Sequence, residues 1–244
     1  MRGEVSRPSP DQRLELMAQI PLPLAVGRHY RFENFVPGRN LEAVTRLQSL
    51  FGDQDPATIW LAGPAGCGKT HLLQAATACA SDGAMYVPLR LASAHGPQLL
   101  RGLDSLSLLA LDDIDVIAGD NDWERALFDL FNRMRSAGGQ TLFSARNPPG
   151  HSGISLPDLA SRVASAVVYR LKSLDDDESL EALQRHAQSR GLELPDPSAR
   201  YLLTRIERDM SAICRWLDEL DAASLAAQRK LTVPFIRDAL AERT

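Results

Sequence analysis

An eight-residue segment, Gly63 to Thr70, limits what this chain can fold into more than any other feature. It has the pattern G-x-x-x-x-G-K-[ST] and lies between an apolar stretch, Thr58–Ala62, and a stretch with helical periodicity that begins at Lys69. Glycines let the backbone N–H groups of such a loop turn inward around phosphate oxygens. The alternative is a glycine-rich turn that binds nothing. Because the segment joins a predicted strand to a predicted helix, we expect a phosphate-binding loop.

The residues of this loop have separate expected roles in binding a nucleotide. Lys69 reaches the outer phosphates, and the Thr70 hydroxyl is a ligand for Mg²⁺. Cys67 contributes only its backbone. The expected contacts to ADP or ATP, which the sequence does not distinguish, are Gly63, Pro64, Ala65, Gly66, Cys67, Gly68, Lys69, Thr70 and His71.

Two acidic residues follow a second apolar stretch about forty residues downstream. Leu106–Leu111 predicts a strand, and Asp112 and Asp113 come directly after it. A strand that ends in two acids is weak evidence alone, because carboxylates commonly cap the next element. Together with the loop it is a Walker B pattern, in which Asp112 holds Mg²⁺ through water and Asp113 polarises an attacking water. The two motifs predict a nucleoside triphosphate site.

From about residue 27, short apolar stretches alternate with helical periods, which is typical of an α/β domain with a mostly parallel sheet. The expected strands are Thr58–Ala62, Ala84–Val87, Leu106–Leu111, Gln140–Ser144 and Ala166–Arg170, and the clearest helix is Trp123–Arg135. Beyond residue 172 only helices are expected, at Asp175–Arg190, Pro197–Ile206, Asp209–Ala227 and from Thr232 onward, with Ser173 and Asp176 as a capping box. We therefore predict an α/β P-loop domain over 27–172 and a small all-helical domain over 173–244.

Composition excludes several other classes of protein. The formal net charge of −4 gives no general attraction to nucleic acid. The three cysteines lack the spacing of a zinc site and are odd in number, so neither a metal site nor a disulfide framework is expected. The sequence has no run of about eighteen apolar residues and no signal-peptide core, so we expect a cytoplasmic protein with no membrane partner.

The first 26 residues are predicted to be a flexible arm with one apolar insert, Gln19-Ile20-Pro21-Leu22-Pro23-Leu24. Two prolines separated by one residue exclude a helix interior or a central strand. The insert is therefore expected to be extended and to present alternate side chains to a partner. The alternative is that it packs on its own domain.

Five segments carry a resemblance to known proteins. Residues 30–40 (YRFENFVPGRN) and 68–73 (GKTHLL) are similar to the AAA+ core of the replication initiator DnaA. The segments 123–132 (WERALFDLFN), 156–162 (LPDLASR) and 226–235 (AAQRKLTVPF) resemble still more closely the Hda family, which comprises AAA+ regulators related to DnaA. The resemblance covers about residues 19–242 and implies a P-loop AAA+ core followed by a helical lid, with nucleotide between them.

The resemblance also implies roles for particular residues. Phe32, Phe35 and Val36 would line the pocket for the base. Arg162 would be an arginine finger, offered to phosphates on a neighbouring subunit, and the alternative is an ordinary surface arginine. In the arm, Gln19, Ile20, Leu22, Pro23 and Leu24 would dock on the β sliding clamp, with the amide of Gln19 at the mouth of a cleft and Leu22 and Leu24 in apolar pockets.

Two positions depart from the family pattern. Ala145 stands where relatives carry Asp before an Arg and a Pro, and Asn147 is a candidate substitute. Ser211 stands where the lid arginine is expected, with Arg208 and Arg215 near it on one helix face. Both departures argue against fast hydrolysis by the chain's own site.

The resemblance therefore implies a regulatory inactivator of DnaA. Bound to a DNA-loaded clamp, it would present Arg162 to ATP held by DnaA, promote hydrolysis there and prevent re-initiation of replication. It would contact DNA only through the clamp, since no helix-turn-helix domain follows the lid in this sequence, and it would form a homo-oligomer of unknown size. The rivals are an autonomous ATPase of the DnaC helicase-loader type and a nucleotide-locked adaptor without catalytic effect.

Overall fold

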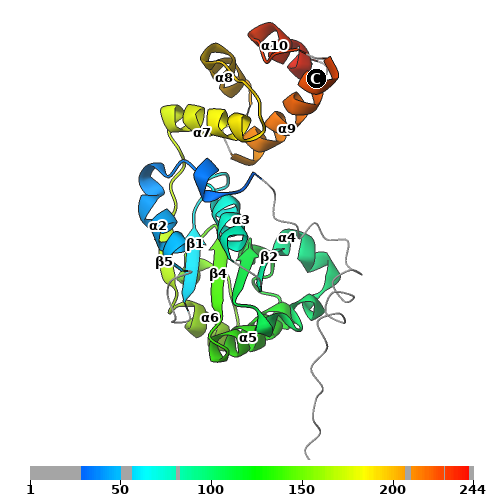
Figure 1. Cartoon of the computed structure of the whole chain (residues 1–244). Coiled ribbons are helices and arrows are strands. Elements are labelled where there is room, and N and C mark those ends of the chain that lie inside the picture. Colours follow the sequence, from blue (N-terminus) through cyan, green and yellow to red (C-terminus); the bar gives the residue numbers. More distant parts are fainter. Residues whose placement is uncertain (1–28, 51–56, 81–82, 207–209, 228, 242–244) are drawn as a thin grey trace, which may run out of the picture.

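The computed structural model describes residues 29–50, 57–80, 83–206, 210–227 and 229–241 (Figure 1). The predicted arm, including Gln19–Leu24, and Arg208 lie outside the described residues. None of the helices in the described part is both long enough and apolar enough to cross a membrane.

A five-stranded parallel sheet forms the centre of the N-terminal part. Its strands are β1 (Thr58–Ala62), β2 (Ala84–Pro88), β3 (Leu108–Asp112), β4 (Gln140–Ala145) and β5 (Val167–Arg170), in the order β2-β3-β4-β1-β5. Nearly every residue of β1, β3 and β4 is buried, as expected for strands covered on both faces. The predicted α/β fold with a parallel sheet is confirmed.

Three predicted strands differ from the observed ones by one residue, because β2 extends to Pro88, β4 extends to Ala145 and β5 begins at Val167. The prediction for the third strand was wrong by more. The third strand begins at Leu108 and not at Leu106, because a 3₁₀ turn precedes it. The N–H of Leu106 donates to the carbonyl of Leu103 (3.2 Å), and that of Ser107 donates to the carbonyl of Gly83 (2.8 Å). The strand also continues through Asp112, which places that carboxylate at the carboxyl edge of the sheet.

Helices cover both faces of the sheet. On one face, α2 (Leu41–Ser49) and α3 (Lys69–Cys79) pack on Leu108 and Ala110. On the other face, α4 (Leu89–Ala92), α5 (Asn121–Ser136) and α6 (Pro157–Val163) pack on Leu109 and Leu111. Because successive side chains of β3 point to opposite faces of the sheet, this strand contributes to the hydrophobic clusters on both faces. The 3₁₀ helices are η1 (Phe32–Asn34), η2 (Gly38–Asn40), η3 (Ser93–His95), η4 (Pro97–Leu100), η5 (Leu103–Ser105), η6 (Ile114–Val116) and η7 (Pro149–His151).

Four helices follow the sheet: α7 (Asp176–Ser189), α8 (Asp196–Leu203), α9 (Met210–Ala227) and α10 (Val233–Ala241). They enclose a hydrophobic cluster of their own, and Figure 1 shows them grouped at one end of the sheet. Both side-chain polar groups of Asn40 pair with the backbone of Lys172, which anchors the connection into this helical group (2.8 and 2.9 Å).

Two predictions about these helices were wrong. The capping box of α7 is formed by Asp175 and Glu178, whose side chains each accept the other's backbone N–H at 2.9 Å. Ser173 takes no part, because its carbonyl accepts from Arg39 and the helix begins only at Asp176. α8 ends at Leu203 and not at Ile206, because a turn follows in which the N–H of residue 205 donates to the carbonyl of residue 202 (2.9 Å).

Candidate nucleotide-binding site

The predicted phosphate loop joins β1 to α3, so the expected strand–loop–helix arrangement is confirmed. Gly66 and Gly68 have positive φ angles of 74° and 97°, which favour glycine. A Cβ atom on Gly68 would lie 2.6 Å from the Phe35 ring. The close approach and the backbone conformation together explain why this position requires glycine.

Lys69 is the first residue of α3 and is 9% exposed. Its ammonium group donates to the carbonyl oxygens of Gly63 (2.7 Å) and Pro64 (2.8 Å). These bonds hold a positive charge beside the loop at the N-terminus of a helix, where the helix dipole also favours anions. The loop therefore has the charge and the backbone geometry of a phosphate site.

Asp112 is the centre of a hydrogen-bond network at the end of β3 and is only 4% exposed. One carboxylate oxygen accepts from the Thr70 hydroxyl and from the Tyr86 hydroxyl, each at 2.7 Å. The other accepts from the hydroxyl of Ser144. Burial and the neighbouring Asp112 carboxylate raise the pKa of Tyr86, so this phenol stays a donor.

The two residues predicted to hold Mg²⁺, Thr70 and Asp112, are thus in direct contact. A hydroxyl and one carboxylate suit Mg²⁺, which usually keeps several waters and takes further oxygens from substrate phosphates. Within the described part of the chain, no group of three or more His, Cys, Asp or Glu side chains is placed to hold a metal by itself. Any Mg²⁺ here would therefore depend on the nucleotide for its remaining ligands.

Asp113 faces a different environment from Asp112. It is the one described non-glycine residue with a positive φ (58°), and this turn separates the two carboxylates. The Asp113 carboxylate forms an ion pair with Arg90 (3.1 Å) at the wall of the cavity described below. Its backbone N–H donates to Ser144, which also bonds Asp112. A left-handed conformation costs about 1–3 kcal/mol in a non-glycine residue, and such strain is concentrated at functional sites.

A cavity of about 420 Å³ opens over the loop. Tyr30 and His71 line it, together with Arg90 of α4, which directly follows β2, and Arg146 of the loop after β4. Met210 of α9 reaches it from the helical group. This volume lies within the usual range for small-molecule sites. The cavity is therefore bounded by the loop, by the carboxyl edge of the sheet and by the C-terminal helices.

The sequence reasoning missed Tyr86, Arg90, Ser144 and Arg146. A signal was present, because Arg90 and Arg146 each follow the end of a predicted strand. The carboxyl ends of parallel strands meet at one edge, which is where ligands bind in such sheets. The N–H of Arg146 also donates to Asp115 (2.6 Å), another cavity residue.

The residues expected to line the pocket for the nucleotide base lie behind the cavity wall. Phe32, Phe35 and Val36 are 5–7% exposed and do not line the cavity. Phe35 instead packs against the ring of His71, with ring centroids 5.1 Å apart. Phe35 thus supports His71, which does line the cavity.

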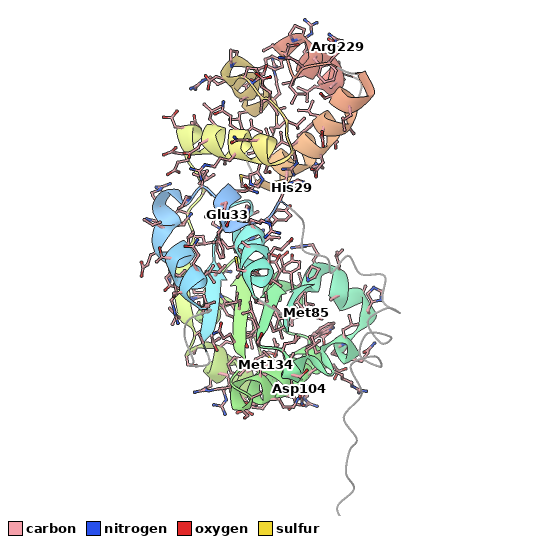
Figure 2. All side chains as sticks on the ribbon, viewed as in Figure 1. His29, Glu33, Met85, Asp104, Met134 and Arg229 are labelled. Carbon is pink, nitrogen blue, oxygen red and sulfur yellow. The ribbon has the colours of Figure 1, made fainter. Side chains whose placement is uncertain are left out.

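His71 and His186 connect the loop helix to α7. Their rings meet edge to face with centroids 5.2 Å apart, and the Nε2–H of His71 donates to the carbonyl of Arg31 (2.8 Å). Burial lowers the pKa of His71 to about 4. Burial, followed by the nearby charges of His71, Arg190 and His29, lowers the pKa of His186 to about 3. Figure 2 shows His29 at this junction.

These two histidines predict a pH dependence of stability. Both take up a proton near pH 6.5 when unfolded but only near pH 3–4 when folded, so the free energy of unfolding is highest above pH 6.5 and falls as the pH drops. Each histidine accounts for a loss of about 2 kcal/mol between pH 7 and pH 5. Urea unfolding at several pH values measures this loss.

His186→Phe keeps an aromatic ring and is expected to remove the contribution of one histidine to the pH slope. His151→Gln, at an exposed position, is the matched control and should keep the slope of the unchanged chain. Equal slopes in all three proteins would contradict the assignment.

The two departures from the family pattern have different positions. Ala145 is fully buried at the end of β4, whereas Asn147 lines the cavity. Arg215 is exposed on α9 and does not line the cavity, and Arg208 lies outside the described residues. Asn147 therefore remains the candidate substitute for the Asp that relatives carry at the position of Ala145.

Arg162 lies at the other end of the sheet from the cavity. It is exposed and is the last residue but one of α6, before the turn into β5, whose Val167 pairs with Ile59 near the start of β1. The phosphate loop follows the far end of β1, about 15 Å along the strand. Figure 1 shows α6 at the end of the sheet away from the C-terminal helices. Arg162 is not brought to the cavity of its own chain.

The comparisons with known proteins define the class. The fold is that of AAA+ proteins: domain III of the replication initiation protein DnaA from Thermotoga maritima matches with a TM-score of 0.73 and 19% identity over 89% of this chain and 98% of that chain. AMPPCP-bound DnaA from Aquifex aeolicus matches with a TM-score of 0.66 and 24% identity over 89% and 71% of the two chains. The RuvB Holliday junction branch migration motor of Thermotoga maritima matches with a TM-score of 0.59 and 16% identity over 84% and 67%.

The C-terminal helices match a narrower family than the fold as a whole does. Residues 176–240 match the family model for the lid domain of Hda. The match confirms the resemblance to the Hda family that the sequence indicated. The chain thus combines a fold similar to that of DnaA with a C-terminal segment that matches the Hda lid-domain model.

Proposed function

We propose that this chain is a regulatory inactivator of DnaA that docks on the DNA-loaded β sliding clamp and promotes hydrolysis of DnaA-bound ATP. The observation that carries the proposal is the position of Arg162, which is exposed and remote from its own cavity. An arginine in that position is accessible to phosphates on another subunit, as an arginine finger supplied in trans must be. The Hda lid match supports the choice of DnaA as the partner.

The chain's own cavity would hold ADP or ATP between the phosphate loop and Met210 of the lid. Lys69, Arg90 and Arg146 supply positive charge for the phosphates, and Thr70 and Asp112 would hold Mg²⁺. The similarity to AMPPCP-bound DnaA supports nucleotide binding. In this proposal residues 27–172 form the nucleotide-binding domain and residues 173–244 the lid, and the buried Ala145 limits hydrolysis at this site.

The clamp would be bound through Gln19–Leu24 in the N-terminal arm. The double change Gln19→Ala and Leu22→Ala removes one amide and one apolar anchor, so we expect at least a 100-fold loss of clamp affinity, since each 1.4 kcal/mol is about tenfold and burial of a leucine alone contributes about 2 kcal/mol. Surface plasmon resonance with immobilised clamp measures the loss, and nucleotide affinity should not change.

The matched control for this pair is Gln12→Ala with Leu14→Ala, which removes the same residue types from the same arm. The control is expected to bind the clamp as the unchanged chain does. Equal clamp affinity for both double variants would remove Gln19–Leu24 as the docking segment.

The proposed function is tested by the conversion of DnaA-bound ATP to ADP, measured with this protein present and with clamp either loaded on DNA or absent. Acceleration that depends on the loaded clamp is expected. ATP turnover by this chain alone, with binding to a helicase and single-stranded DNA, would instead favour the helicase-loader class. Clamp binding without any effect on the nucleotide of DnaA would favour a nucleotide-locked adaptor.

A further inference from the structure

Glu124 of α5 is a buried carboxylate that gathers four hydrogen-bond donors. It is 1% exposed and accepts from the backbone N–H groups of Gly119 (2.7 Å), Ser155 (2.9 Å) and Leu156 (2.6 Å), and from the Ser155 hydroxyl (2.9 Å). Burial by itself raises the pKa of Glu124, but these hydrogen bonds outweigh it and lower the pKa. The side chain therefore stays charged and fully engaged.

The donors come from two loops: one directly precedes α5 and the other directly precedes α6. Gly119 ends the loop that begins at Asp113 and passes through η6. Ser155 and Leu156 lead directly into α6, and Leu156 is its N-cap residue. One carboxylate thus joins the loop that carries the second Walker B acid to the start of the helix that carries Arg162.

α6 depends on contacts outside itself for its orientation. It has only seven residues and no side-chain cap of its own. A helix this short is not stable from its backbone hydrogen bonds alone. Its apolar side is held by Leu159 and Val163, both fully buried against the cluster that includes α5. Its N-terminal end is held by Glu124.

We propose that Glu124 is a positioning residue that fixes α6, and with it Arg162, relative to the loop of Asp113. The proposal rests on the proposed function of Arg162 in trans. In this proposal Glu124 contacts neither the nucleotide in the chain's own cavity nor the ATP on DnaA. It acts because a seven-residue helix without an internal cap takes its direction from the charged group that binds its leading loop.

Two variants and one control test the proposal. Glu124→Gln keeps the size of the side chain but replaces one of the two accepting oxygens by an NH₂ group. That group is itself a donor, so it cannot accept from the N–H groups that now bind there. Ser155→Ala removes one of the four bonds at an exposed residue. Ser161→Ala, on the exposed face of α6, is the matched control.

Four readouts separate positioning from general destabilisation. Amide hydrogen exchange over residues 154–163 is expected to speed up in Glu124→Gln while the sheet stays protected. The maximal rate of stimulated hydrolysis on DnaA should fall about tenfold or more, since small misplacements of a catalytic group have effects of this size. The protein concentration for half-maximal stimulation and the chain's own nucleotide affinity should change less than about twofold, because Glu124 contacts neither binding surface. Ser155→Ala should lie between Glu124→Gln and the control.

The outcomes distinguish this proposal from the proposed function. If the unchanged chain stimulates hydrolysis and Glu124→Gln does so at the same maximal rate, the positioning proposal is overturned. If Glu124→Gln loses protection over the whole chain, Ser155→Ala decides, and a rate equal to that of Ser161→Ala overturns the proposal. If the unchanged chain does not stimulate at all, the proposed function fails, and equal exchange over 154–163 in Glu124→Gln and Ser161→Ala would overturn the structural part as well.

Discussion

Arg162→Ala is expected to reduce the clamp-dependent hydrolysis of DnaA-bound ATP by about 10³-fold, the lower end of the range for arginine fingers. The guanidinium group would stabilise negative charge that develops on the transferred phosphoryl group. Alanine removes the charge and all of the hydrogen-bond donors at once. Single-turnover conversion of radiolabelled ATP on DnaA measures the loss.

The fold should not depend on Arg162, because its side chain is exposed on α6. The melting temperature, nucleotide affinity and clamp affinity of the variant should therefore match those of the unchanged chain. Arg162→Lys keeps the charge without the planar fork and should recover only part of the rate. Arg125→Ala, an exposed arginine on the neighbouring α5, is the control. Full stimulation by Arg162→Ala would contradict the role assigned to this residue.

Lys69→Ala is expected to weaken binding of ADP or ATP to the chain's own cavity by about 100-fold, equivalent to about 3 kcal/mol. The ammonium group is held beside the loop by the carbonyls of Gly63 and Pro64. Its removal leaves the phosphates with backbone donors only at this end of the cavity. Isothermal titration calorimetry with each nucleotide measures the change.

Lys172→Ala removes an exposed lysine near the connection to the lid and is the matched control for charge. It should bind nucleotide as the unchanged chain does, since the hydrogen bonds of Lys172 to Asn40 use its backbone. Nucleotide affinities within about threefold of each other for the two variants, a difference of less than 1 kcal/mol, would show that the cavity over the loop is not the nucleotide site.

Several features were predictable because they depend on residues close together in the chain. The turn from β1 into α3 needs glycines at Gly66 and Gly68, and the sequence shows them in the spacing of a phosphate loop. The contact between Thr70 and Asp112 was also predictable, since the phosphate loop follows β1, Asp112 ends β3, and both of these parallel strands end at the same edge of the sheet. The all-helical nature of the segment after residue 170 followed from its periodicity.

Other features join segments that the sequence keeps far apart. Ser144 bonds Asp112 across 32 positions, and Glu124 binds the loop before α6 across 31 and 32 positions. No local pattern marks these partners, because a buried carboxylate takes whichever donors the packed helices and strands bring to it. The burial of Phe32 and Phe35 likewise depends on how the segment around η1 packs on α3, where Phe35 meets the ring of His71.

Short motifs were enough to predict the kind of site, since the phosphate loop and the pair of acids each consist of consecutive residues. The tertiary structure alone decided that Arg162 lies at the opposite end of the sheet from its own cavity. The reason is geometric: parallel strands all end at one edge, whereas the helix that returns to the start of β5 ends at the other.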